Sequence, residues 1–102
     1  MAIYIERMIQ KIAPGKWGAL EVLDQHFNAV ESKLGFPPKR RMRAILGGQS
    51  VDTLVVEREW ESLAAFEAAT MKRMGDPANA ALDAESIGVI ESLVWEIYMV
   101  LP

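Results

Sequence analysis

A strand that runs directly into a helix occupies the middle of the chain, over residues 51–68 (VDTLVVEREWESLAAFEA). Residues 53–60 are rich in Val, Thr and Trp and have the length of a strand. From Leu63 onward the apolar residues follow helical spacing, and the Ser62 hydroxyl can accept hydrogen bonds from the first free N–H groups of that helix. The junction therefore divides the chain, and we expect a strand–helix–strand unit before it and a second half after it.

The segments on either side of the junction predict the order β-α-β-β-α-β. In the ferredoxin-like fold this order forms four antiparallel strands with the helices on one face. The fold class is then α+β, and 102 residues make one domain over 1–102. The expected elements are strands over residues 3–12, 41–47, 53–60 and 93–101, and helices over 16–34, 62–74 and 77–85, with 87–92 ambiguous.

The face of the sheet without helices is expected to mix apolar and charged side chains. A turn near residues 49–50 would pair Arg43 with Glu57 and Arg41 with Glu59 across neighbouring strands. The apolar side chains of this face would form a large exposed patch, which is unusual on a monomer. We therefore expect a homodimer through this open face. By alternation, the face carries Tyr4, Glu6, Met8, Ile45, Val55, Glu57, Val94, Glu96, Tyr98 and Val100.

Composition excludes several classes of function. The net charge of −3 disfavours nucleic acid as a partner. The absence of cysteine removes disulfides, thiolate nucleophiles and thiolate metal sites, and with a single histidine we expect neither a metal nor another cofactor. The N-terminus carries Glu6 and Arg7 early, unlike a signal peptide, and no apolar run approaches the ~20 residues of a membrane span. We expect a soluble, cytoplasmic protein with no membrane contact.

Two segments resemble known families. Residues 4–7 (YIER) followed by 13–16 (APGK) are similar to the Tyr-x-x-Arg…Pro-Gly-Lys opening of NIPSNAP-like proteins. Residues 59–66 (EWESLAAF), with Asp76-Pro77 downstream, resemble the strand–helix junction of NIPSNAP-like and antibiotic-biosynthesis-monooxygenase-like proteins. The resemblance implies the dimeric α+β barrel superfamily, in which two ferredoxin-like sheets pack face to face and ligand pockets lie between helices and sheet. Its members include cofactor-free oxygenases and haem-degrading enzymes.

Arg7 and Arg58 are the candidate binding residues, because alternation places each on the helix-facing side of a strand. A buried guanidinium is costly unless it is paired. One interpretation is an anion hook, in which the planar fork of donors holds a carboxylate or enolate. The alternative is that each arginine pairs with a nearby glutamate or extends to solvent at a strand end.

His26 is the only histidine and lies at the edge of the apolar stripe of the first predicted helix. It can act as a general base facing a pocket, or it can be a boundary side chain half in water. Haem-degrading members of the superfamily carry an essential histidine on their second helix, and this chain has none there. Trp17, Trp60 and Trp95 can line an aromatic pocket or belong to the core.

These residues lead to two hypotheses. The first is a cofactor-free oxygenase or isomerase that acts on a small anionic or aromatic substrate. Its pocket would be bounded by Arg7, Trp17, His26, Arg58, Trp60 and Trp95, with an arginine holding the substrate oxyanion and His26 taking a proton. The second is a non-catalytic ligand-binding or interaction dimer. A cavity of at least ~300 Å³ between helices and sheet, with an arginine pointing in, would favour a ligand site.

Overall fold

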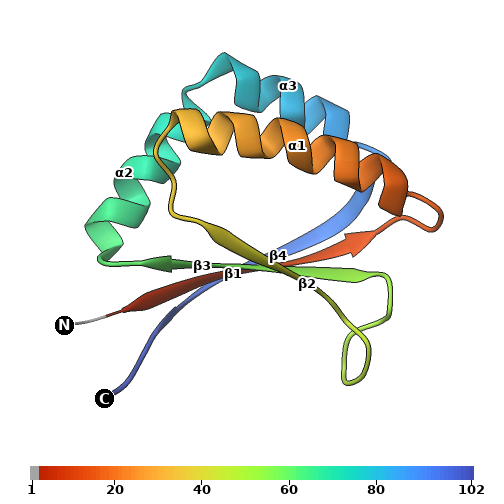
Figure 1. Cartoon of the computed structure of the whole chain (residues 1–102), viewed down its shortest axis with the longest axis horizontal. Coiled ribbons are helices and arrows are strands. Elements are labelled where there is room, and N and C mark those ends of the chain that lie inside the picture. The colour runs from red at the N-terminus through yellow and green to blue at the C-terminus, as the bar shows by residue number, and fades with distance from the viewer. Residues whose placement is uncertain (1–2) are drawn as a thin grey trace.

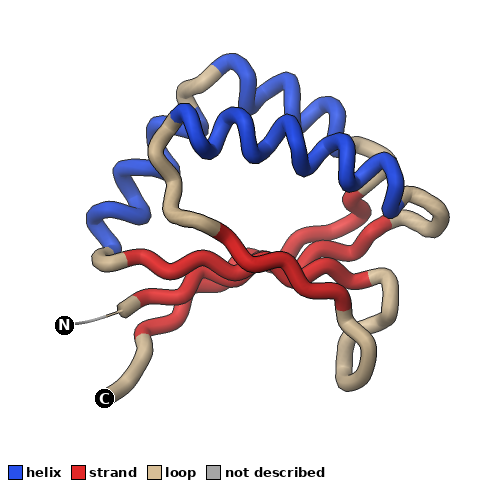
Figure 2. Tube along the Cα trace, viewed as in Figure 1, coloured by secondary structure: helices blue, strands red, loops and turns tan. Residues whose placement is uncertain are grey.

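Four antiparallel strands form one sheet, and three helices cover one of its faces in the computed structural model (Figures 1 and 2), which describes residues 3–102. The sheet order is β2-β3-β1-β4, so β1 and β3 are central and β2 and β4 are edges. The predicted ferredoxin-like βαββαβ order is confirmed. The elements are β1 (Tyr4–Ile12), α1 (Trp17–Lys33), β2 (Lys39–Arg43), β3 (Thr53–Trp60), α2 (Leu63–Met74), α3 (Pro77–Ser86) and β4 (Ile90–Met99).

Local capping sets the helix boundaries. The Ser62 hydroxyl accepts a hydrogen bond from the Ala65 N–H at 3.0 Å, which starts α2 directly after β3. The Asp76 carboxylate accepts from the Ala78 N–H at 2.9 Å, and Pro77 occupies the first turn of α3. Gly35 follows α1 with a φ of 75°, a left-handed conformation that glycine adopts without strain.

The two edge strands differ from their predicted ranges. β2 begins earlier and ends at Arg43, because the following residues leave the sheet in a loop where Gly47 adopts a φ of 124°. That φ lies outside the β region, so the predicted strand cannot continue through Gly47. β4 covers Ile90–Met99 and therefore includes the end of the ambiguous segment.

The faces of β1 are the reverse of those predicted, and Arg7 is therefore not under the helices. In the β1–β3 register Glu6 lies opposite Arg58 and Met8 lies opposite Val56. Glu6 and Met8 are therefore on the same, helix-facing side of the sheet as Arg58 and Val56. The alternation of β1 was ambiguous because both of its faces carry apolar residues. The fully buried Ile12 places the even-numbered positions of β1 inward.

The predicted pairing of β2 with β3 is also wrong. Arg40, not Arg43, lies opposite Glu57, and Arg41 lies opposite Val56 rather than Glu59. Arg41 turns to the helix side, where its Nη2 contacts Glu21 Oε1 at 2.8 Å. The shift follows from the longer loop between the strands, which moves the register away from that of a tight turn.

Two apolar clusters join the helices to the sheet. One packs Leu20 of α1 against the strands, and the other packs α1 against Leu82 of α3. The helix residues in these clusters come from α1 and α3, and α2 contributes no buried residue to either. The buried members of the clusters are Ile12, Leu20, Leu54 and Val56 in the first, and Leu23, Val30 and Leu82 in the second.

Candidate functional site: a cleft between the helices and the edge strand β4

A cleft with a volume of about 440 Å³ lies between the helices and the β4 edge of the sheet. It satisfies the size expected of a small-molecule site. The cleft is open along β4, where the helix-facing side chains, among them Leu93, Trp95 and Ile97, are exposed to solvent. The residues that line it are Glu6, Met8, Gln10, Phe27, Phe36, Thr70, Arg73, Met74, Asn79, Asp83, Ser86, Ile90, Glu91, Ser92, Leu93 and Trp95.

The floor of the cleft is built on Glu6 of β1. The Trp60 Nε1–H donates to Glu6 Oε1 at 3.0 Å, and the Trp95 Nε1–H donates to Glu6 Oε2 at 2.8 Å. Arg58 Nη1 lies 3.6 Å from Glu6 Oε1. A buried carboxylate needs such partners, and the two indole donors satisfy both of its oxygens. The glutamate thereby orients Trp60 and Trp95 around itself.

A buried ion network continues from this floor to α1. Arg58 donates from Nη2 to Glu31 Oε1 at 2.8 Å and from Nε to the Pro37 carbonyl at 2.8 Å. Lys39 Nζ contacts the same Glu31 oxygen at 3.1 Å and Asp24 Oδ1 at 2.8 Å. Opposite charges at these distances compensate one another in the low-dielectric interior. The network connects β2, β3 and α1.

Arg73 of α2 is the cation that lines the cleft. Its Nε donates to Asn79 Oδ1 at 3.0 Å, and its Nη1 lies 3.4 Å from Glu31 Oε2. Its guanidinium lies 5.2 Å from the centroid of Phe27 and 5.8 Å from that of Phe36. The aromatic rings favour a cation at this position. Arg73 thus presents a held guanidinium beside an apolar wall.

The aromatic side chains form a connected series along the helix-facing side of the sheet. Phe36 and Trp60 meet edge to face at 5.6 Å between centroids, as do Trp60 and Phe66. Phe66 then meets Trp95 at 5.7 Å. Edge-to-face contacts of this kind are favourable for aromatic pairs. The series gives the cleft a rigid wall on the side of α2.

The structure brings only part of the predicted site together. Arg58, Trp60 and Trp95 surround Glu6, and of these only Trp95 lines the cleft itself. Trp17 lies away from it, where its Nε1–H donates to Asp52 Oδ1 at 3.0 Å. The roles of these residues in binding stay predictions.

His26 is on the exposed surface of α1. Its Nδ1 lies 2.8 Å from Glu85 Oε1, so the side chain bridges α1 and α3 outside the cleft. Its proposed role as a general base stays a prediction that this placement does not favour.

Arg7 lies on the open face, where it contacts Glu57. Its Nη2 is 2.7 Å from Glu57 Oε2, and Arg40 Nη2 is 2.6 Å from Glu57 Oε1. The hydrogen bond from Arg40, followed by that from Arg7, lowers the pKa of the Glu57 carboxyl below its ordinary value. Arg7 therefore pairs with a nearby glutamate, which is the structural alternative to the anion hook.

Sequence reasoning missed Glu6 and Arg73. Alternation along β1 predicts Glu6 on the open face, but the register with β3 places it under the helices. Arg73 lies in the last turn of α2, where a basic side chain is ordinary because it complements the helix dipole. Its distance along the sequence from Phe27 and Phe36 hid the contact, and no local signal marks it as a cleft residue.

Within residues 3–102, no cluster of three or more histidine, aspartate or glutamate side chains has the arrangement needed to hold a metal ion. Within the same range, no helix has both the length and the apolar character needed to cross a membrane.

The fold is similar to several solved structures, although no protein-family model matches the sequence and no curated protein matches it. A NIPSNAP family protein from Agrobacterium tumefaciens has 20% identity and a TM-score of 0.76, over 98% of this chain and 92% of that one. An uncharacterized NIPSNAP domain protein from Burkholderia xenovorans has 15% identity and a TM-score of 0.77, over 97% and 93%.

A third structure comes from Bacteroides fragilis and is described as a dimeric protein of unknown function with a ferredoxin-like fold. It has 12% identity and a TM-score of 0.67, over 96% of each chain. The predicted structural resemblance to NIPSNAP-like and dimeric ferredoxin-like proteins is confirmed. At these identities the likeness shows the fold alone.

Proposed function

We propose that this chain binds a small, largely apolar or aromatic molecule that carries an anionic group, in the cleft beside β4, as a subunit of a homodimer. The observation that carries the proposal is the 440 Å³ cleft in which the Arg73 guanidinium lies beside Phe27 and Phe36. Apolar walls with a few placed polar groups are typical of small-molecule sites. The apolar part of the ligand would contact Met8, Met74 and Trp95.

The charge around Arg73 supports an anionic ligand. Glu31 is shared by three cations, since Arg58, Lys39 and Arg73 all contact its carboxylate. Arg73 has the longest of these contacts, at 3.4 Å, and is therefore the least compensated by it. Three carboxylates also line the cleft. Glu6 is compensated by two indole N–H groups and by Arg58, and Asp83 and Glu91 are exposed to water, which screens their charge.

The geometry supports binding more than the oxygenase or isomerase hypothesis. His26, the proposed base, contacts Glu85 outside the cleft. Glu6 is in the cleft, but both of its oxygens accept hydrogen bonds from indole N–H groups and Arg58 lies 3.6 Å away, so the contacts it makes are structural ones that orient Trp60 and Trp95. A binding dimer is therefore the first function to test.

Binding of an aromatic carboxylate should depend on Arg73. We expect benzoate or phenylacetate to shift amide resonances of the cleft residues in two-dimensional NMR titrations, and neutral benzamide to bind more weakly. Arg73→Ala should weaken carboxylate binding about 10-fold or more, since a hydrogen bond to a charged group contributes roughly 1.5–3 kcal/mol. Lys33→Ala, at a side chain 69% exposed, is the control and should leave binding unchanged. Equal affinities for benzoate and benzamide, or an unaffected Arg73→Ala variant, would contradict the proposal.

The dimer is proposed to form through the open face of the sheet, where apolar side chains remain uncovered. Among them, Val94 and Tyr98 are exposed, and Ile5, Ile9 and Val55 are partly exposed. Covering them contributes roughly 25 cal/mol for each Å². The corrected strand faces keep this conclusion, because Ile5 and Ile9 replace Tyr4 and Met8 on the open side.

A charge introduced at Val94 should dissociate the dimer. We expect the parent chain to be a dimer at micromolar concentration in sedimentation equilibrium, and Val94→Asp to be a monomer under the same conditions. Burying an unpaired carboxylate in each subunit costs several kcal/mol, which corresponds to a loss of at least about 100-fold in affinity. Val22→Asp is a matched control, because Val22 is 51% exposed and Val94 53%, and Val22 lies on the helix side. A parent monomer, or a Val94→Asp dimer, would refute the open-face interface.

A further inference from the structure

A second hollow adjoins the cleft and extends it along α2. It has a volume of about 300 Å³ and is lined by Leu63, Phe66, Glu67, Thr70 and Met71. These positions share one side of the helix, because they follow the i, i+3, i+4, i+7, i+8 pattern. Thr70 lines the cleft as well, so the two spaces meet at this residue. The cleft therefore continues as a groove along α2.

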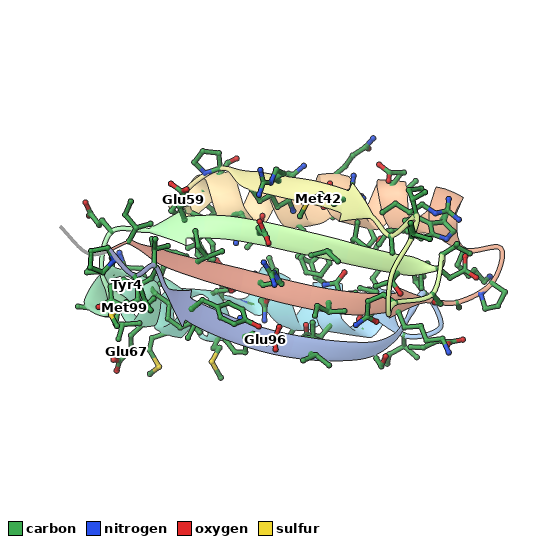
Figure 3. All side chains as sticks on the ribbon, turned by 90° about the horizontal axis from the view of Figure 1, so that it is seen from below. Tyr4, Met42, Glu59, Glu67, Glu96 and Met99 are labelled. Carbon is green, nitrogen blue, oxygen red and sulfur yellow. The ribbon has the colours of Figure 1, made fainter. Side chains whose placement is uncertain are left out.

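The edge strand β4 forms the opposite side of this groove. Its helix-facing apolar side chains are between 38% and 56% exposed, namely Leu93, Trp95, Ile97 and Met99. Trp95 meets Phe66 of α2 at 5.7 Å between ring centroids, which joins the two sides. In the strand registers Met99 is level with Trp60, so Met99 and the start of α2 lie at the same end of the sheet. Figure 3 shows the labelled Met99 and Glu67 at that end, and Figure 1 shows α2 rising from it.

Flexible apolar side chains make up most of the groove on the side of α2. Met71 and Met74 are 64% and 71% exposed, and Leu63 is 48% exposed at the start of the helix. Methionine is unbranched, and surfaces rich in it adapt to partners of variable shape. A contiguous exposed apolar surface is a mark of a binding site. Because the apolar side chains continue in a line along α2 and β4, this surface fits a flexible chain rather than a single ring.

Arg73 and Glu67 give the groove a direction. Arg73 presents its guanidinium in the cleft, beside Phe27 and Phe36. Glu67 belongs to the second hollow and is exposed. A carboxylate is attracted to the guanidinium and repelled by the carboxylate of Glu67. The head of an anionic chain should therefore lie at Arg73, with its tail directed toward the start of α2.

We propose that the ligand is a linear aliphatic carboxylate, a fatty acid, with its head at Arg73 and its alkyl chain in the groove between α2 and β4. The inference rests on the anion site proposed above and adds the chemical class of the ligand. From Leu63 to Arg73 the helix advances by ten residues, or roughly 15 Å. An extended chain advances roughly 1.2 Å per bond, since three backbone bonds span up to ~3.6 Å. The groove therefore matches a chain of about 12 carbons.

A series of saturated carboxylates from hexanoate to tetradecanoate tests the length of the groove. Each methylene that is fully removed from water should raise the affinity about fourfold, and one that stays partly wet about twofold. We expect the affinity to rise by these factors up to about 12 carbons, the length of the groove, and then to level off. Isothermal titration calorimetry measures the affinities, at concentrations below those at which the carboxylates form micelles. Dodecyltrimethylammonium carries the same chain on a positive head and should bind more weakly than dodecanoate.

A charge placed in the groove tests where the tail lies. Met71→Glu should weaken dodecanoate binding about 10-fold or more, because the carboxylate keeps water in the groove and displaces about two methylenes. Met71 is 64% exposed, so the variant should fold. Val22→Glu adds the same charge on α1, at a side chain 51% exposed, and should leave dodecanoate binding unchanged. With isotope-labelled methionine, the methyl resonances of Met71 and Met99 should shift with dodecanoate and not with hexanoate, while that of Met42 on the open face stays in place.

An affinity that does not rise with chain length would overturn the inference, as would a rise that Met71→Glu leaves intact. Equal binding of dodecanoate and dodecyltrimethylammonium would overturn the place of the head at Arg73. Benzoate, measured on the parent chain and on Arg73→Ala, separates this inference from the proposed function. If benzoate binding depends on Arg73 but the chain-length series is flat, the fatty-acid inference alone fails. If neither benzoate nor dodecanoate binding depends on Arg73, both fail.

Discussion

Replacing Arg58 with alanine should lower the free energy of unfolding by about 3–5 kcal/mol, because it leaves buried carboxylates without their cation. Arg58 is 3% exposed and contacts Glu31 Oε1 at 2.8 Å and Glu6 Oε1 at 3.6 Å. It also donates to the Pro37 carbonyl, so the variant loses a link to the segment before β2. Urea denaturation followed by circular dichroism, at one fixed protein concentration, measures the change.

Two further variants separate charge from packing at this site. Arg58→Lys keeps the charge but loses the planar fork that reaches Glu31 and Pro37 together, so it should be destabilised, though less than Arg58→Ala. Lys33→Ala removes an exposed cation and should change stability by less than about 1 kcal/mol. If Arg58→Ala were as stable as Lys33→Ala, the network would not hold β3 to α1.

Replacing Leu23 with alanine should cost about 2–5 kcal/mol of stability, as expected for a cavity in a closely packed core. Leu23 is 1% exposed and packs with Val30 and Leu82, which join α1 to α3. The next residue toward the N-terminus supplies a matched control, since Val22 is 51% exposed on the same helix. Val22→Ala should remain within about 0.5 kcal/mol of the parent chain.

The measurement for this pair is thermal or urea unfolding under identical conditions. A loss below about 1 kcal/mol for Leu23→Ala would show that the α1–α3 contact relaxes to fill the space. The comparison also bears on the cleft, because Phe27 packs against the same cluster and stands beside Arg73. A well-packed cluster is what keeps this wall of the cleft in place.

The order of the elements could be read from the sequence because it depends on local signals. Ser62 and Asp76 cap α2 and α3 where expected, and β3 covers the residues that its Val-rich pattern predicts. Those signals act between residues close in the chain, so no knowledge of the packing is needed. The edge strands were less well predicted, since their ends depend on a loop conformation at Gly47 and on pairing partners.

The faces of the strands separate what the sequence determines from what the packing decides. The alternation of β3 is clear, and Arg58 was correctly placed inside. The alternation of β1 is ambiguous, because both of its sides carry apolar residues. As a result, Glu6 and Arg7 lie on the opposite faces to those predicted. The open face nevertheless keeps its mixed character, so the reason for expecting a second copy survives the exchange.

By itself, the sequence determined the βαββαβ order, the helix starts and the presence of a buried arginine on β3, because periodicity and capping are local. Only the tertiary structure decided that Glu6 lies beneath Trp60 and Trp95, that Arg7 belongs to the open face, and that Arg73 enters the cleft. The physical reason is that a buried charge goes where its partners are, and those partners come from distant parts of the chain. Antiparallel register, which local pattern specifies only when one face is clearly apolar, brings them together.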